Sequence, residues 1–154
     1  MLLRDVPQPA ARDTMHDGAL TLALAKVFRV GNSPWNVPAY RFDMMAEGSR
    51  AGTISLRIGD ETRLVLYAGH IGYTVEPAWR GRHFAERAVR LLYPLARAHG
   101  FTALWATCTP DNLASRRTLE RLGAVYVETV PIPPDYESYA RGEREKCRYR
   151  IDLA

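Results

Sequence analysis

The sequence contains little cysteine and no long apolar segment. Cys108 and Cys147 lie far apart, without a CxxC pair or a Cys/His cluster of the kind that binds metal. We therefore expect two reduced, buried thiols and no metal site. The first 17 residues carry scattered charges instead of an apolar secretory region, and the run Leu20–Ala25 is too short to span a bilayer. We expect a soluble, cytoplasmic protein without a membrane partner.

The composition excludes disordered and fibrous classes for the chain as a whole. Of 154 residues, 47% are hydrophobic and 25% are charged, as in ordinary globular domains. No internal repeat or low-complexity tract interrupts the sequence. We expect a flexible N-terminal arm over residues 1–17 and a single domain over residues 18–154.

Positive charge is concentrated in one segment. The formal net charge is +4, and the segment Arg80–Arg121 contains eight arginines but only three acidic residues. Because the rest of the chain is nearly neutral, this segment is where an anionic ligand is expected. The arginines are not interleaved with aromatic residues, so nucleic acid is the less favoured partner.

Hydrophobic periodicity predicts four strands in the first half of the chain. Alternating apolar residues mark about Leu20–Val30, Tyr40–Met44 and Thr53–Ile58, and a hairpin turn at Gly59–Thr62 leads into a long fourth strand, about Leu64–Val75.

The second half alternates helices and strands. Helical spacing from Phe84 to a stop at Gly100 is followed by a buried strand, Ala103–Cys108. A second helix begins at Asp111 or Asn112 and closes at Gly123. Strands at Ala124–Val130 and Lys146–Leu153 complete the order, which is typical of a mixed sheet with helices on its faces.

The most informative segment runs from Val75 to Ala85, off a strand and into a helix. Backbone N–H groups at such a helix start point toward a common ligand, and the helix dipole favours an anion there. Gly81 permits close backbone approach, while Arg80 and Arg82 add charge. This pattern indicates a pyrophosphate cradle that is neither a Walker loop nor a GxGxxG fingerprint.

Two motifs together resemble the GNAT-type N-acetyltransferases. The sequence Arg80-Gly81-Arg82-His83-Phe84-Ala85, after Val75 and Pro77, is similar to that family's acetyl-CoA signature. The sequence Asn112-Leu113-Ala114-Ser115, followed by Leu122-Gly123-Ala124, is similar to its second motif. The resemblance extends from about Leu20 to the end and is strongest over residues 68–130. His83 departs from the family by replacing its usual central glycine.

The resemblance implies an α/β (α+β) fold. It predicts a mixed, mostly antiparallel sheet of about seven strands, with helices on both faces and a splay between strands four and five. The family's first two helices are expected to be shortened or absent, because only Gly31–Ala39 separates the first two strands.

The resemblance also implies an acyl-CoA-dependent N-acyltransferase. Acetyl-CoA would donate an acetyl group to a primary amine, which attacks directly in a ternary complex. The expected cofactor contacts are Val75, Arg80, Gly81, Arg82, His83, Phe84, Ala85, Asn112, Ser115, Arg116 and Arg117. Leu119 stands where the family often has a tyrosine general acid, so the catalytic candidates are Tyr73, His70 and Glu76.

The acceptor side of the site is left open. Trp35, Tyr136 and Tyr139 are loop aromatics that we predict to bind a small-molecule or peptide amine. The loop Pro131–Arg144, from the same chain or from a homodimer mate, is expected to wall this site. A CoA-binding module that has lost catalysis is one alternative, because of Leu119; a nucleic-acid-binding protein is the other.

Overall fold

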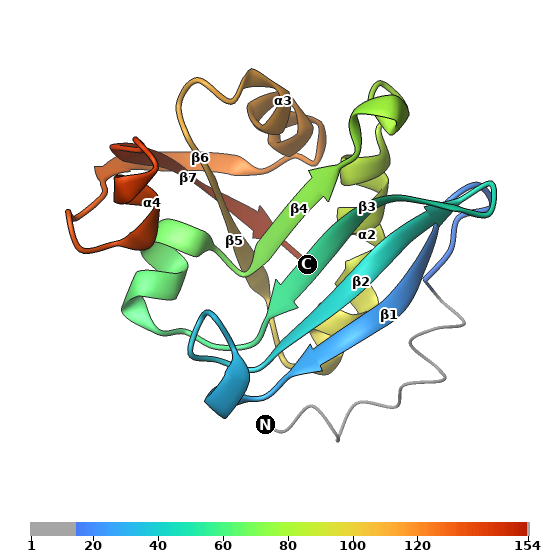
Figure 1. Cartoon of the computed structure of the whole chain (residues 1–154), viewed down its shortest axis with the longest axis horizontal. Coiled ribbons are helices and arrows are strands. Elements are labelled where there is room, and N and C mark those ends of the chain that lie inside the picture. Colours follow the sequence, from blue (N-terminus) through green and yellow to red (C-terminus); the bar gives the residue numbers. More distant parts are fainter. Residues whose placement is uncertain (1–14, 154) are drawn as a thin grey trace.

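The computed structural model describes residues 15–153, which form seven strands in two sheets (Figure 1). The first sheet has the order β1-β2-β3-β4 and the second the order β5-β7-β6, and all neighbouring strands are antiparallel. The strands are β1 (Thr21–Phe28), β2 (Ala39–Ala46), β3 (Ser49–Arg57), β4 (Ile71–Val75), β5 (Ala103–Cys108), β6 (Val125–Pro131) and β7 (Glu145–Asp152). The predicted seven-stranded, mostly antiparallel fold is confirmed.

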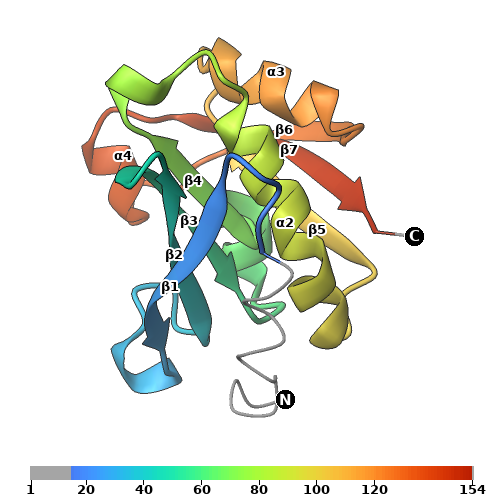
Figure 2. The same cartoon turned by 90° about the vertical axis from the view of Figure 1, so that its right-hand side faces the viewer.

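Within these residues, three helices and three short helical turns connect the strands. The helices are α2 (Phe84–Ala98), α3 (Leu113–Arg121) and α4 (Glu137–Ala140), and the turns are η2 (Val30–Asn32), η3 (Leu64–Ala68) and η4 (Pro77–Trp79). Helix α2 packs against β3 and β4, and α3 packs against β5 and α2 (Figure 2). The β1–β2 connection holds only η2, as the short Gly31–Ala39 segment predicts.

The two sheets meet at one junction and then diverge. Gly69 bridges Ala106, and the His70 N–H donates to the Trp105 carbonyl at 2.8 Å. Beyond this point β4 pairs only with β3, and the Glu76 N–H bonds the Ala51 carbonyl at the far end of that ladder. Antiparallel alternation therefore turns the backbone N–H groups of Tyr73 and Val75 toward the gap beside β5. The predicted splay between the fourth and fifth strands is confirmed.

The predicted hairpin at Gly59–Thr62 and the long fourth strand are wrong. Leu64–Ala68 forms a π-helical turn, closed by the Gly69 N–H on the Leu64 carbonyl at 2.6 Å, and β4 begins only at Ile71. A short apolar run does not distinguish strand from helix by periodicity alone. Here the turn is decided by contacts with β5 and β7, which are distant in the sequence.

Residues 15–17, predicted to belong to a flexible arm, are packed against the domain. Met15 is buried, and its carbonyl accepts a bond from the Leu22 N–H at 2.9 Å. Asp17 forms an ion pair with Arg87 of α2 at 2.6 Å. Residues 15–17 are thus part of the packed domain because they close its edge against β1 and α2. Residues 1–14 of the predicted arm lie outside the described residues.

We predict that Gly69→Ala strongly destabilises the junction. Gly69 has φ +76°, and a Cβ there would lie 2.7 Å from the Trp105 carbonyl oxygen. Gly48→Ala is the matched control, because Gly48 has φ +75° and a Cβ there would meet nothing within 4 Å. Urea unfolding should show a loss of about 3 kcal/mol for Gly69→Ala and about 1 kcal/mol for Gly48→Ala. Equal losses would show that the close approach of the strands carries no energy.

Candidate functional site

A cavity of about 600 Å³ opens between the end of β4, the start of α2 and α3. The turn η4 leads into two left-handed residues, Gly81 (φ +88°) and His83 (φ +58°). The first helical bond of α2 runs from the Arg87 N–H to the His83 carbonyl at 3.0 Å. The N–H groups of Phe84 and Ala85 therefore have no partner within the helix and are available to an anion.

Helix α3 forms the opposite wall of this cavity. The Asn112 side chain caps the helix by accepting the Ser115 N–H at 3.1 Å. Nearly all predicted cofactor contacts line the cavity, the two exceptions being Arg82 and Arg116. Arg82 pairs with Glu47 at 2.7 Å, whereas Arg116 donates to the Tyr149 hydroxyl at 3.1 Å.

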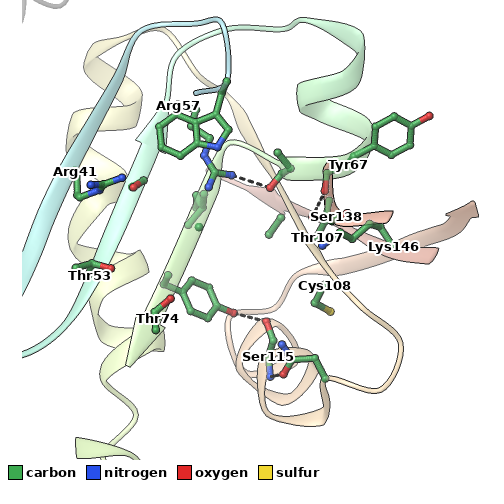
Figure 3. Close-up of a pocket in the computed structure, with 18 of the residues that line it drawn as sticks. Arg41, Thr53, Arg57, Tyr67, Thr74, Thr107, Cys108, Ser115, Ser138 and Lys146 are labelled. Atoms are coloured by element: carbon green, nitrogen blue, oxygen red, sulfur yellow. Dashed lines mark hydrogen bonds between the residues drawn. The ribbon is translucent and has the colours of Figure 1, made fainter. Parts of the chain in front are cut away.

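A second cavity of about 900 Å³ lies over the polar face of β2, β3 and β4 (Figure 3). Its far wall comes from η3, β5 and the segment after β6. Trp35 and Tyr136 line it, and so do several other residues of the loop Pro131–Arg144. Tyr139 does not, since its ring packs 3.7 Å from the Arg144 guanidinium.

The two cavities share four lining residues, Tyr73, Thr74, Asn112 and Ser115. The Tyr73 phenol and the Ser115 hydroxyl are hydrogen-bonded at 2.9 Å across the gap between β4 and α3 (Figure 3). Burial raises the pKa of Tyr73, so the phenol is protonated at neutral pH. Burial also raises the pKa of the neighbouring Cys108 thiol to about 11, which keeps it unreactive as a nucleophile.

His70 lies at the sheet junction and lines neither cavity. Its Nδ1 accepts the Trp105 N–H at 3.0 Å, and its Nε2 lies 3.0 Å from the Gly59 carbonyl. Because an N–H can only donate and a carbonyl can only accept, the ring is held as the neutral Nε2–H tautomer. Burial lowers the pKa of His70, consistent with this neutral form. Its geometry gives it a structural role.

Glu76 also lies apart from the junction of the cavities. It forms an ion pair with Arg50 at 3.2 Å and lines neither cavity. Of the three catalytic candidates, only Tyr73 is therefore placed where the cavities meet. Leu119, at the position of the family's usual tyrosine, is buried in the core and supplies no acid.

Sequence reasoning missed Arg41 and Arg57, which line the larger cavity. Both occupy the polar positions of alternating strands, a face that is ordinarily solvated. No local signal distinguishes them, because the Arg57 guanidinium occupies the space over Gly72, which only the strand register places opposite Ser55.

Neither a metal cluster nor a membrane helix occurs in the described part of the chain. Residues 15–153 contain no group of three or more His, Cys, Asp or Glu side chains that could hold a metal ion. No helix among them is both long enough and apolar enough to cross a membrane.

Comparison with family models matches residues 8–125 to the "Acetyltransferase (GNAT) domain". No curated protein matches the chain significantly. Many solved structures share its fold at low identity.

Three of these structures illustrate the likeness. An N-acetyltransferase from Staphylococcus aureus Mu50 has a TM-score of 0.57 at 18% identity, covering 75% of this chain and 68% of that chain. Ribosomal-protein-S5-alanine acetyltransferase from Vibrio fischeri has a TM-score of 0.60 at 21% identity, and the match covers 75% of this chain and 62% of that chain. The microcin C7 self-immunity acetyltransferase MccE, in complex with acetyl-CoA and AMP, has a TM-score of 0.57 at 19% identity. The match covers 74% of this chain and 61% of that chain. The chain thus spans less than two thirds of the latter two proteins.

We predict that acid weakens the domain through His70. Its folded pKa lies below the ordinary value of 6.5, so the folded state resists the proton that the unfolded chain takes up. The contribution of His70 to the free energy of unfolding is therefore present above about pH 6.5 and is lost as pH falls from there toward the lower folded pKa. Urea unfolding should show a larger loss between about pH 7 and pH 5 for the wild type than for His70→Gln. Identical pH dependence would contradict this role.

We predict that His83→Gly stabilises the protein. His83 occupies the left-handed region at φ +58°, which disfavours any residue with a Cβ. Glycine removes that penalty but adds backbone entropy to the unfolded chain, leaving a net gain of about 0.5–1 kcal/mol in unfolding free energy. His83→Val, which is β-branched, should lose stability. A loss for His83→Gly would show that the imidazole makes a compensating contact.

Proposed function

Because the chain belongs to the GNAT acetyltransferase family, we propose that it transfers an acetyl group from acetyl-CoA to a primary amine by direct attack within a ternary complex. The observation that carries this proposal is the meeting of two cavities at Tyr73, Thr74, Asn112 and Ser115. One cavity suits a phosphate-bearing cofactor and the other suits an acceptor. Holding two reactants at one junction supplies much of the rate in such a reaction.

The smaller cavity has the chemistry to hold CoA. The unbonded first-turn amides of α2 and the flanking Arg80 suit its pyrophosphate. Arg117 lines the same cavity and is exposed, which suits the 3′-phosphate. The N–H groups of Tyr73 and Val75 on the open edge of β4 suit the pantetheine amides and the thioester carbonyl. Structural neighbours bound to acetyl-CoA or CoA support this assignment.

Acetyl-CoA supplies an activated acyl group to the amine that occupies the larger cavity. The amine nitrogen forms a bond to the carbonyl carbon, the carbon–sulfur bond breaks, and the amine loses a proton as the thiolate gains one. We assign the proton donor to the Tyr73 phenol, which is protonated at neutral pH because burial raises its pKa. Ser115 orients that phenol through their 2.9 Å hydrogen bond.

The two alternatives are less well supported by the structure. A lapsed CoA-binding module is motivated by the buried Leu119, yet Tyr73 occupies the junction where an acid is needed. A nucleic-acid surface requires free arginines, whereas Arg82, Arg87 and Arg121 each pair with a carboxylate. These ion pairs neutralise much of the positive charge of the Arg80–Arg121 segment.

The proposal is tested by calorimetry with acetyl-CoA and by release of free thiol in the presence of an amine panel. Saturable binding raises the melting temperature by mass action, and turnover requires an acceptor. Absence of both heat and thermal shift at excess acetyl-CoA would contradict the CoA site. Binding without thiol release from any amine would favour the lapsed module.

We predict that Tyr73→Phe lowers kcat by about 100-fold and leaves the Kd for CoA within about twofold. The substitution removes the proton donor but keeps the ring and its packing. The kcat of the wild type should fall only above about pH 10, because the Tyr73 phenol loses its proton as pH rises through its raised pKa. Tyr126→Phe is the control, since Tyr126 is half-exposed and lines neither cavity. An unchanged kcat in Tyr73→Phe would remove the tyrosine from the mechanism.

A further inference from the structure

The larger cavity is lined by more cations than acids. Six basic side chains, Lys26, Arg41, Arg50, Arg57, Arg141 and Lys146, face only three carboxylates. Lys146 pairs with Glu143 at 2.9 Å, and Arg50 lies 3.9 Å from Asp43. Within residues 15–153, the other four cations form no ion pair with a carboxylate. The cavity therefore has an excess of positive charge that the described chain does not neutralise.

Arg57 is built into the floor of this cavity. Its guanidinium stacks on Trp35 at 4.4 Å and fills the space over Gly72, where a Cβ would lie 2.3 Å from Nη2. Its Nη1 donates to the carbonyls of Ala68 and Gly69 at 2.8 and 3.0 Å. Its Nε has no hydrogen-bond partner in the part of the chain described. This arrangement fixes a cation in place while leaving donor capacity unused.

The cost of holding Arg57 there is high. Only 9% of the residue is exposed, and burial lowers its pKa to about 10, so it still carries its charge at neutral pH. Arg41 adds a second positive charge nearby and lowers that pKa further. Two adjacent cations without a carboxylate repel each other, and an anionic ligand bound to both would relieve that repulsion.

The positions of Arg41 and Asp43 along β2 suggest how an acceptor would lie in the larger cavity. Asp43 follows Arg41 on the same face, about 7 Å further along the strand. Asp43 registers with Thr53, and Thr53 registers with Thr74, a residue of the cavity junction. Arg41 and Arg57 thus lie away from the junction, and Asp43, which is 3.9 Å from Arg50, lies on the way to it. An amine whose anionic group binds Arg41 and Arg57 would have its nitrogen on the junction side, toward Asp43 and Tyr73.

We propose that the acceptor is a small amine that carries a carboxylate or a phosphate, held by Arg57 and Arg41 with its amino group directed to the cavity junction. This inference rests on the proposed acetyl transfer, which it narrows to one class of acceptor. Planar guanidinium groups bind carboxylates and phosphates alike through paired hydrogen bonds. The experiments below therefore compare amines that carry one or the other.

The first test measures binding without turnover. Protein saturated with CoA, which fills the phosphate cradle, is titrated with inorganic phosphate or acetate, and its melting temperature is compared with that in sodium chloride of equal ionic strength. We expect stabilisation of the wild type and of Arg150→Gln, a half-exposed control that lines neither cavity. Arg41→Gln should lose the effect. Equal shifts in Arg41→Gln and wild type would overturn the inference.

The second test measures acceptor choice by thiol release. O-Phosphoethanolamine is compared with ethanolamine, and 4-aminobutyrate with its amide. We expect kcat/KM to be at least about tenfold higher for an anionic amine than for its neutral counterpart. Arg41→Gln should raise KM about tenfold for the preferred anionic amine and so abolish its preference over the neutral amine, whereas Arg150→Gln should preserve that preference. Neutral amines that react as fast as anionic ones would overturn the inference.

The two tests separate this inference from the proposed function. Thiol release that is indifferent to acceptor charge would leave an acetyltransferase but remove the anion site. Phosphate stabilisation that depends on Arg41, without thiol release from any amine, would keep the anion site and remove the transferase.

Discussion

The architecture depends on the junction where Gly69 and His70, just before β4, meet β5. There the His70 backbone N–H bonds the Trp105 carbonyl, and the His70 ring accepts the Trp105 N–H. One residue thus satisfies both the N–H and the carbonyl of Trp105, and no further pairing is needed between the strands. Because β4 then stays with β3 while β5 belongs to the other sheet, a gap opens beyond the junction. A continuous ladder would have closed that gap and hidden the edge of β4.

The gap brings the two cavities together. On one side of the gap lies the smaller cavity, which is lined by the open backbone edge of β4 and the start of α2. On the other side lies the larger cavity, which is lined by the polar face of the first sheet. Tyr73 reaches across the gap to Ser115, so the only described tyrosine that lines both cavities is also the one hydrogen-bonded at their meeting point. The charge distribution is consistent with this division. The smaller cavity, proposed for CoA, has helix amides and arginines at its rim, whereas the larger cavity, proposed for the acceptor, buries Arg57.

Local signals are sufficient to find the residues that line the smaller cavity. Gly81, the helix start at Phe84 and the Asn112 cap are recognisable because short-range backbone chemistry determines them. The number of strands and the splay, which follow from the family resemblance, are confirmed.

Long-range contacts decide the features that sequence reasoning does not reach. The π-helical turn at Leu64–Ala68 depends on contacts with β5 and β7, which no local pattern reports. The intrinsic pKa of His70 suggests a base, but tertiary hydrogen bonds fix the ring as a neutral structural group. Arg57 escapes notice because its position on an alternating strand resembles a solvated one.

The central claim is that acetyl-CoA enters the gap between β4 and β5 and meets the acceptor beside Tyr73. A crystal structure of the protein with CoA tests it most directly. We expect the pyrophosphate at the start of α2, the pantetheine along the open edge of β4, and the sulfur within hydrogen-bonding reach of the Tyr73 phenol. A cofactor bound outside the gap, or a sulfur remote from Tyr73, would contradict the claim.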